Sequence, residues 1–170
     1  MNPGSESSET RKRPLLLCYD GSPDSIEAIE LAGELIGGGP ALVLNVWLPP
    51  SALILAGRIA ADSHPLAPAI AEFDDAAHKD AERIAAEGAG AASRVGFEAT
   101  PLTERAGHGV WRAIVQVADE HDARAVIVGS HGRSAAASAV LGSVSHGVVN
   151  HCARPVLVAP CSGDHLDVED

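Results

Sequence analysis

Short apolar runs alternate along this chain with longer segments in which apolar residues recur every three or four positions. Such runs are typical of buried strands, and the longer segments are typical of helices with one apolar face. The expected strands are Leu15–Asp20, Ala41–Trp47, Phe97–Thr103, Ala125–Val128 and Val156–Ala159. Helices between successive strands require crossover connections, so the pattern predicts an α/β fold with a five-stranded parallel sheet and helices on both faces.

Local signals predict where the helices begin and which side faces the core. Ser22 is typical of a helix N-cap and Pro23 of the first helical position, while Gly37–Gly39 is expected to end that helix. Ser143 is expected to cap the last helix. The residues expected to face the core are Ile26, Ile29, Gly33 and Ile36 in the first helix and Ile70, Phe73, Ala77, Ala81 and Ile84 in the next.

Three stretches depart from this regular alternation. Residues 1–13 and 162–170 are polar, and the second stretch is acidic, so both are expected to be disordered tails around a single domain of residues 14–161. Leu48–Ala67 is long and contains Pro49, Pro50 and Pro65. Two interpretations of it stay open: a short helix that fills a groove on its own domain, or a lid or partner contact.

The composition of the 170-residue chain argues against several classes of partner. Its net charge is -11, and a protein that neutralises many phosphates of DNA or RNA needs the opposite balance, so nucleic acid is not an expected partner. No apolar stretch approaches the roughly 20 residues that cross a bilayer, so no membrane partner is expected. Three cysteines without CxxC spacing are typical of reduced thiols, which indicates a cytoplasmic protein.

A glycine-rich loop follows the fourth expected strand. It reads Gly129-Ser130-His131-Gly132, and after nine further residues Gly142-Ser143 leads into a helix. Such a loop suits phosphate, because its backbone N–H groups and the helix N-terminus carry partial positive charge and glycine allows close approach. Asp20 closes the first strand at the same sheet edge, where parallel sheets bind ligands. The plainer alternatives are a tight turn at the glycines, a helix cap at Ser143 and a turn residue at Asp20.

Other familiar catalytic and metal motifs are absent from the sequence. There is no GxxxxGK[ST] phosphate loop, no GxGxxG dinucleotide pattern, and no HExxH or CxxC metal pattern. His131, His146 and His151 surround the glycine-rich loop and the helix after it, and we interpret them as surface histidines rather than as a metal site. No catalytic residue and no metal ligand are therefore predicted.

Three segments together follow the pattern of one known family. Gly129, Gly132, Gly142 and Ser143 match G-x2-G-x9-G-[ST] without a gap. Tyr19-Asp20-Gly21-Ser22 and Arg154-Pro155-Val156-Leu157-Val158 flank that loop in chain order. From about Pro14 to Pro160 the chain thus resembles the nucleotide-binding branch of the universal stress protein family. The resemblance implies a Rossmann-like, adenine nucleotide alpha hydrolase-like sheet with strand order 3-2-1-4-5.

The resemblance also implies a role for each matched residue. By this resemblance Asp20 would face the ribose or a phosphate-bound metal, and Val46 would contact adenine through its backbone. Gly129 would contact the ribose. From its place within the loop, independently of the resemblance, His131 is also expected beside the phosphates. The residues implied to bind the phosphates, through amides and one hydroxyl, are Gly132, Gly142, Ser143 and Val144.

The implied ligand is ATP, or AMP or ADP, with Mg²⁺ held mainly by the phosphates. The implied assembly is a homodimer paired through the last strand, Val156–Ala159. The first hypothesis is therefore an ATP-binding regulator that signals stress or energy state. An enzyme that slowly hydrolyses ATP or transfers an adenylyl group on the same fold is the alternative, and a dimer that has lost nucleotide binding is a third possibility.

Overall fold

The centre of the fold is a parallel sheet whose five strands are contributed from the whole length of the chain. The structure is a computed structural model that describes residues 13–55, 67–132 and 141–160. The strands are β1 (Leu15–Cys18), β2 (Gly39–Trp47), β3 (Phe97–Arg105), β4 (Ala125–Gly129) and β5 (Val156–Ala159). They pair in parallel in the order β3-β2-β1-β4-β5, which confirms the predicted fold class and strand order.

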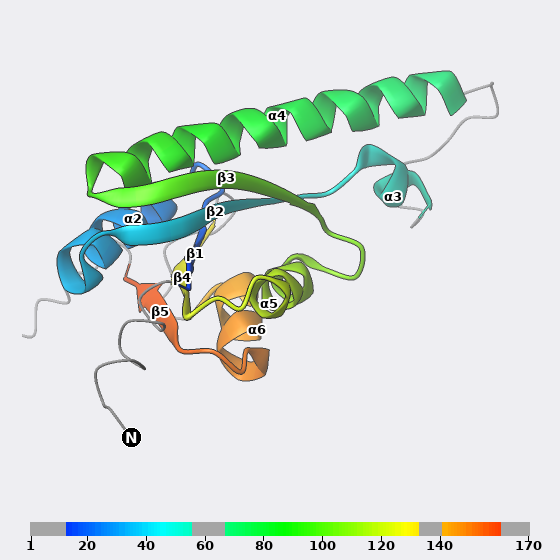
Figure 1. Cartoon of the computed structure of the whole chain (residues 1–170). Helices are drawn as coiled ribbons and strands as arrows, with labels where there is room; N and C mark the ends of the chain where they lie inside the picture. Colours follow the sequence, from blue (N-terminus) through cyan, green and yellow to red (C-terminus); the bar gives the residue numbers. More distant parts are fainter. Residues whose placement is uncertain (1–12, 56–66, 133–140, 161–170) are drawn as a thin grey trace, which may run out of the picture.

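Helices cover both faces of this sheet (Figure 1). They are α2 (Pro23–Ile36), α3 (Pro50–Leu55), α4 (Ala67–Arg94), α5 (Val110–Glu120) and α6 (Ser143–His151). The first core cluster joins one face of the sheet to α2 and α4, and the second joins the other face to α5 and α6. Among the described residues, no helix is both long enough and apolar enough to span a membrane.

The middle strand β1 is buried on both sides. Leu15 and Leu17 belong to the cluster under α2 and α4, whereas Leu16 belongs to the cluster under α5 and α6. Alternate residues of a strand point to opposite faces, so a strand in the middle of a covered parallel sheet must be apolar throughout. This requirement explains the continuous apolar run from which β1 was predicted.

The predicted start of α2 is confirmed, and so is its end. Ser22 is the N-cap, and its hydroxyl oxygen accepts a hydrogen bond from the N–H of Ser25 at 3.3 Å. Pro23 occupies the first helical position, where its missing N–H costs nothing. Gly37 closes the helix at φ +74°, a conformation that favours glycine.

The predicted core-facing sides of α2 and α4 are wrong at one position each. Ile26 is 38% exposed, because the buried side of α2 is turned toward Ala28 and Ala32. Phe73 is 62% exposed, whereas Ile84 further along α4 is buried. Figure 1 shows why: the first turns of α4 extend past the sheet toward α3, so they have no sheet beneath them.

The long segment after β2 contains the short helix α3. Ser51 of α3 binds Asp74 of α4 twice, through its N–H to Oδ1 at 3.0 Å and through its hydroxyl to Oδ2 at 2.5 Å. These hydrogen bonds lower the pKa of the Asp74 carboxyl group. The rest of the segment, residues 56–66, lies outside the described residues, as do residues 1–12 of the predicted tail 1–13 and the whole predicted tail 162–170.

Candidate functional site

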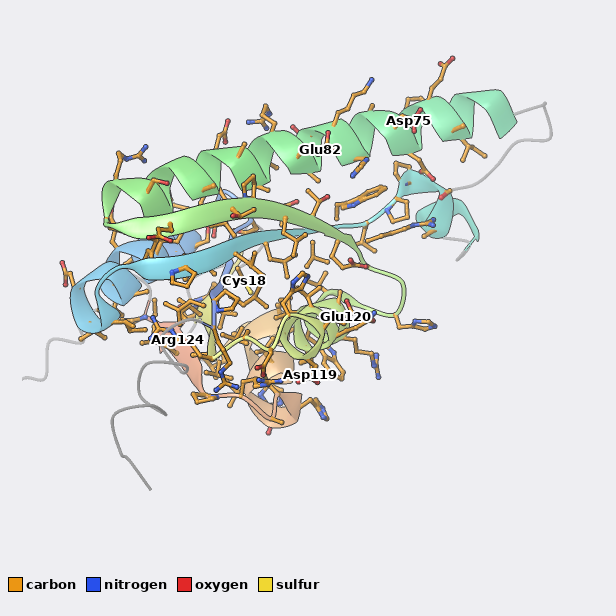
Figure 2. The ribbon with its side chains drawn as sticks, viewed as in Figure 1. Cys18, Asp75, Glu82, Asp119, Glu120 and Arg124 are labelled. Carbon is orange, nitrogen blue, oxygen red and sulfur yellow. The ribbon has the colours of Figure 1, made fainter. Side chains whose placement is uncertain are left out.

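The predicted site lies at the carboxyl ends of β1 and β4, which are neighbours in the sheet. After β1 the chain continues into α2 on one face, and after β4 it continues toward α6 on the other. Two adjacent parallel strands whose connections leave to opposite faces create a crevice at their carboxyl ends. Cys18, labelled in Figure 2, is the last residue of β1 and marks this edge.

Asp20 and Gly132 lie close together at these strand ends. The Oδ1 atom of Asp20 accepts a hydrogen bond from the N–H of Ser22 at 2.9 Å, which fixes the carboxylate at the start of α2. A Cβ atom placed on Gly132 would lie only 2.9 Å from Oδ2 of Asp20. A side chain at position 132 would therefore push the Asp20 carboxylate out of its place.

Gly129 is held by packing against α2. A Cβ atom on Gly129 would lie 2.9 Å from both Cβ and the backbone carbonyl carbon of Asp24. The end of β4 thus touches the first turn of α2, and only glycine leaves enough room for this approach. Packing explains the need for glycine at this position without any ligand.

Gly142 connects the glycine-rich loop to the N-terminus of α6. Its N–H donates to the carbonyl oxygen of Ser130 at 2.9 Å, and its own carbonyl oxygen accepts from the N–H of His146 at 2.9 Å. Gly142 is therefore the N-cap, and the prediction that Ser143 caps this helix is wrong, because Ser143 is already its first helical residue. Ser143 and Val144 consequently lie in the first turn, where backbone N–H groups have no acceptor within the helix.

The remaining two predicted residues are His131, in the loop that follows β4, and Val46, on β2. The N–H of His131 donates to Oδ2 of Asp24 at 3.1 Å, and its Nδ1 atom lies 3.0 Å from Oγ of Ser130. Val46 is near the end of β2, in register with Glu104 of β3, and packs against the cluster under α5 and α6. The structure therefore brings the predicted residues at or just after the ends of β1 and β4 together with the start of α6, while Val46 lies on β2, the neighbour of β1 in the sheet.

Four polar residues that sequence analysis did not select hold this region together. Asp24, Ser130 and Ser145 form a buried hydrogen-bonded chain: the Ser130 hydroxyl donates to Asp24 at 3.1 Å, and the Ser145 hydroxyl donates to the Ser130 carbonyl at 2.8 Å. Asn45 of β2 donates from Nδ2 to the carbonyl oxygen of Tyr19 at 2.8 Å, just before Asp20. An acid in the first turn of a helix is usually explained by the helix dipole, so no sequence signal pointed from Asp24 to a loop 106 residues away.

One histidine of α6 packs against an aromatic ring of α5. The ring of His151 stacks on Trp111 of α5, with the ring centroids 4.4 Å apart. Within residues 13–55, 67–132 and 141–160 there is no group of three or more His, Cys, Asp or Glu side chains that could hold a metal ion.

Comparison with solved structures finds the same fold in several proteins of low sequence identity. Hypothetical protein MJ0577 is 18% identical, with a TM-score of 0.70 over 91% of this chain and 99% of that one. A universal stress protein from Archaeoglobus fulgidus, solved in complex with dAMP, is 22% identical, with a TM-score of 0.58 over 88% of this chain and 98% of that one. A universal stress protein solved in complex with cAMP is also 22% identical, with a TM-score of 0.57 over 88% and 97% of the two chains.

Comparison at the level of sequence gives the family. No curated protein matches the chain. The family model for universal stress proteins, in contrast, matches residues 12–160, which include every strand of the sheet and the whole glycine-rich loop. The chain belongs to the universal stress protein family.

Proposed function

We propose that this protein binds an adenine nucleotide, ATP first of all, at the carboxyl ends of β1 and β4, and that it acts as a regulator of stress or energy state. The observation that carries the proposal is the close approach of the Asp20 carboxylate to Gly132, beside the N-terminus of α6. The two related structures with dAMP and cAMP support an adenine nucleotide as the ligand class.

The chemistry of this edge suits phosphate. The first-turn N–H groups of α6 and the positive end of its dipole favour an anion, and the absence of a side chain at Gly132 and Gly142 lets oxygen atoms approach the backbone. Amide groups of this kind bind phosphate without lysine or arginine, so a protein with a net charge of -11 can still hold a compact anion here.

Asp20 also fits a magnesium ion that accompanies the nucleotide. Mg²⁺ is usually held by one or two carboxylates together with substrate phosphates and water. Asp20 supplies one carboxylate, placed by the N–H of Ser22 at the crevice, and the remaining ligands would come from the phosphates and water. The ion would screen the repulsion between the phosphates and Asp20.

We further propose that the protein forms a homodimer through β5. The two edges of the sheet are β3 and β5. Exposed Glu98 and Pro101 on β3 oppose pairing with another strand, because proline lacks an N–H and charge disfavours a dry contact. On β5 the carbonyl groups of Pro155 and Ala159 accept from β4, so the alternate residues Val156 and Val158 direct their N–H groups to the outer side, where a second copy can pair.

Calorimetric titration tests nucleotide binding. ATP with Mg²⁺ is titrated into protein stripped of bound ligand, and into the variants Gly132→Val and Gly107→Val. Valine at 132 would crowd the Asp20 carboxylate, whereas a Cβ on Gly107 meets nothing within 4 Å, so Gly107→Val is the matched control. We expect about one ATP per chain in the wild type and in the control, and loss of binding in Gly132→Val.

Two results of this titration contradict the proposal. Folded wild-type protein that binds no adenine nucleotide excludes nucleotide sensing, and equal loss in both glycine variants excludes the loop as the site. ATP turnover on the order of 1 per second in the same samples, typical of enzymes, would instead favour the catalytic alternative.

A further inference from the structure

We infer that Asp24, a buried acid in the first turn of α2, is a positioning residue that holds the start of the glycine-rich loop, Ser130–Gly132, through Ser130 in the conformation that binds phosphate. The inference rests on the proposed function of the same site. Asp24 is 8% exposed, and its Oδ2 atom accepts from both the hydroxyl of Ser130 and the backbone N–H of His131, each at 3.1 Å. Both donors belong to the loop, and neither belongs to α2.

Ser130 is the junction through which Asp24 acts. The N–H of Ser130 donates to the carbonyl oxygen of Ala159 in β5, at 2.9 Å. Its carbonyl oxygen accepts from the N–H of Gly142 at 2.9 Å and from the hydroxyl of Ser145 at 2.8 Å. With the hydroxyl bond to Asp24, this one residue joins α2, β5 and the N-terminus of α6. A shift of Ser130 therefore moves the α6 N-terminus relative to Asp20.

The second bond from Asp24 fixes the backbone immediately before Gly132. The His131 N–H is held by Oδ2 of Asp24, and the His131 ring is held on the same side, with Nδ1 3.0 Å from Oγ of Ser130 and 3.6 Å from Oδ2 of Asp24. The opposite ring nitrogen, Nε2, consequently lies on the side of the imidazole away from the carboxylate. Asp24 thereby sets both the course of the chain at Gly132 and the orientation of the histidine expected beside the phosphates.

Charge repulsion alone predicts that removal of the Asp24 charge raises the affinity for ATP, whereas the positioning role predicts that it lowers this affinity. A negative charge close to a triphosphate weakens binding, so removal of the Asp24 charge would strengthen it if Asp24 did nothing else. A buried carboxylate is also costly unless hydrogen bonds satisfy it, and here the loop supplies those bonds. The two explanations therefore differ in sign: loss of loop alignment weakens ATP binding, and loss of repulsion alone strengthens it.

The test compares a ligand with phosphates and one without. Affinities for ATP with Mg²⁺ and for adenosine are measured by calorimetry on the full chain, for the wild type, Asp24→Asn, Asp24→Ala and Ser130→Ala. Glu30→Gln is the matched control, because it removes one negative charge from an exposed position of the same helix. Thermal unfolding of each variant reports on the fold.

We expect the ratio of ATP affinity to adenosine affinity to fall about tenfold or more in Asp24→Ala and Ser130→Ala, as the loss of charge-assisted hydrogen bonds implies. Asp24→Asn keeps one acceptor oxygen and should show a smaller loss, and Glu30→Gln should keep the wild-type ratio.

Three results overturn the inference: an unchanged ratio in the folded variants, stronger ATP binding in Asp24→Asn, or equal weakening of both ligands together with a lower melting temperature. The last result would assign Asp24 a purely structural role. Wild-type protein that binds neither ligand refutes the proposed function, and this inference falls with it, whereas the three results above leave the proposed function intact.

Discussion

Two glycines in α4, two residues apart, should respond to alanine in opposite directions. Gly88 faces the sheet, where a Cβ atom would lie 2.5 Å from Cδ1 of Tyr19 and 2.8 Å from Cγ1 of Val43. Gly90 faces outward, where the nearest atom to such a Cβ is Nη1 of Arg94 at 3.8 Å, an ordinary contact. Both glycines lie in the same helix, so the difference in unfolding free energy between the two alanine variants reports on the packing of α4 against the sheet.

The magnitudes follow from two competing effects. Alanine in a helix interior is favoured over glycine by about 1 kcal/mol, and both variants gain this. At position 88 the new methyl group meets Tyr19 and Val43, which are both buried and cannot move aside, and overpacking of this kind costs roughly 1–3 kcal/mol. We therefore expect Gly90→Ala to raise the free energy of unfolding by about 1 kcal/mol, and Gly88→Ala to lower it by about 1 kcal/mol.

Urea denaturation of the two variants beside the wild type measures these differences. A change in the midpoint at constant slope reports a change in stability. The variants should also melt several degrees apart, since about 1 kcal/mol corresponds to roughly 2–4 °C in a chain of this size. If Gly88→Ala proves as stable as Gly90→Ala, the close approach of α4 to β1 and β2 is refuted. Because Tyr19 directly precedes Asp20, Gly88→Ala should in addition weaken ATP binding, while Gly90→Ala should not.

Two further predictions concern the thiol of Cys18 and the outer edge of β5. Burial raises the pKa of the Cys18 thiol, so little nucleophilic thiolate forms at pH 8. Iodoacetamide should therefore modify Cys18 only after unfolding in urea, as read from peptide masses, and equal labelling of native protein contradicts this. Val158→Pro removes an outward N–H of β5 and should give a folded monomer by light scattering, whereas Val158→Ala keeps the N–H and should stay dimeric. A dimer that persists in the proline variant places the interface elsewhere.

The fold could be predicted from the sequence because its signals are local. A strand buried on both faces must be apolar at every position, which makes runs such as Leu15–Cys18 easy to recognise. Errors arose where a residue's environment depends on distant parts of the chain. Phe73 has the spacing of a core residue, yet α4 extends past the sheet at that point, so Phe73 is 62% exposed. In the sequence, Asp24 looks like an acid that interacts favourably with the positive end of the α2 dipole. Only the fold brings it within hydrogen-bond distance of Ser130.

The contrast between local signals and contacts made only in the fold also applies to the glycine motif. Each of its three glycines is needed for a different physical reason. Gly129 leaves room for Asp24 on α2, and Gly132 leaves room for the Asp20 carboxylate. Gly142 leaves room for the carbonyl oxygen of Ser130, which a Cβ atom at position 142 would approach to 3.1 Å. A substitution at Gly129 would therefore separate β4 from α2 and report on folding, whatever the protein binds. Gly132 lies beside the Asp20 carboxylate, which is predicted to face the ligand. Among the three glycines it is therefore the position at which loss of binding can be separated from loss of structure.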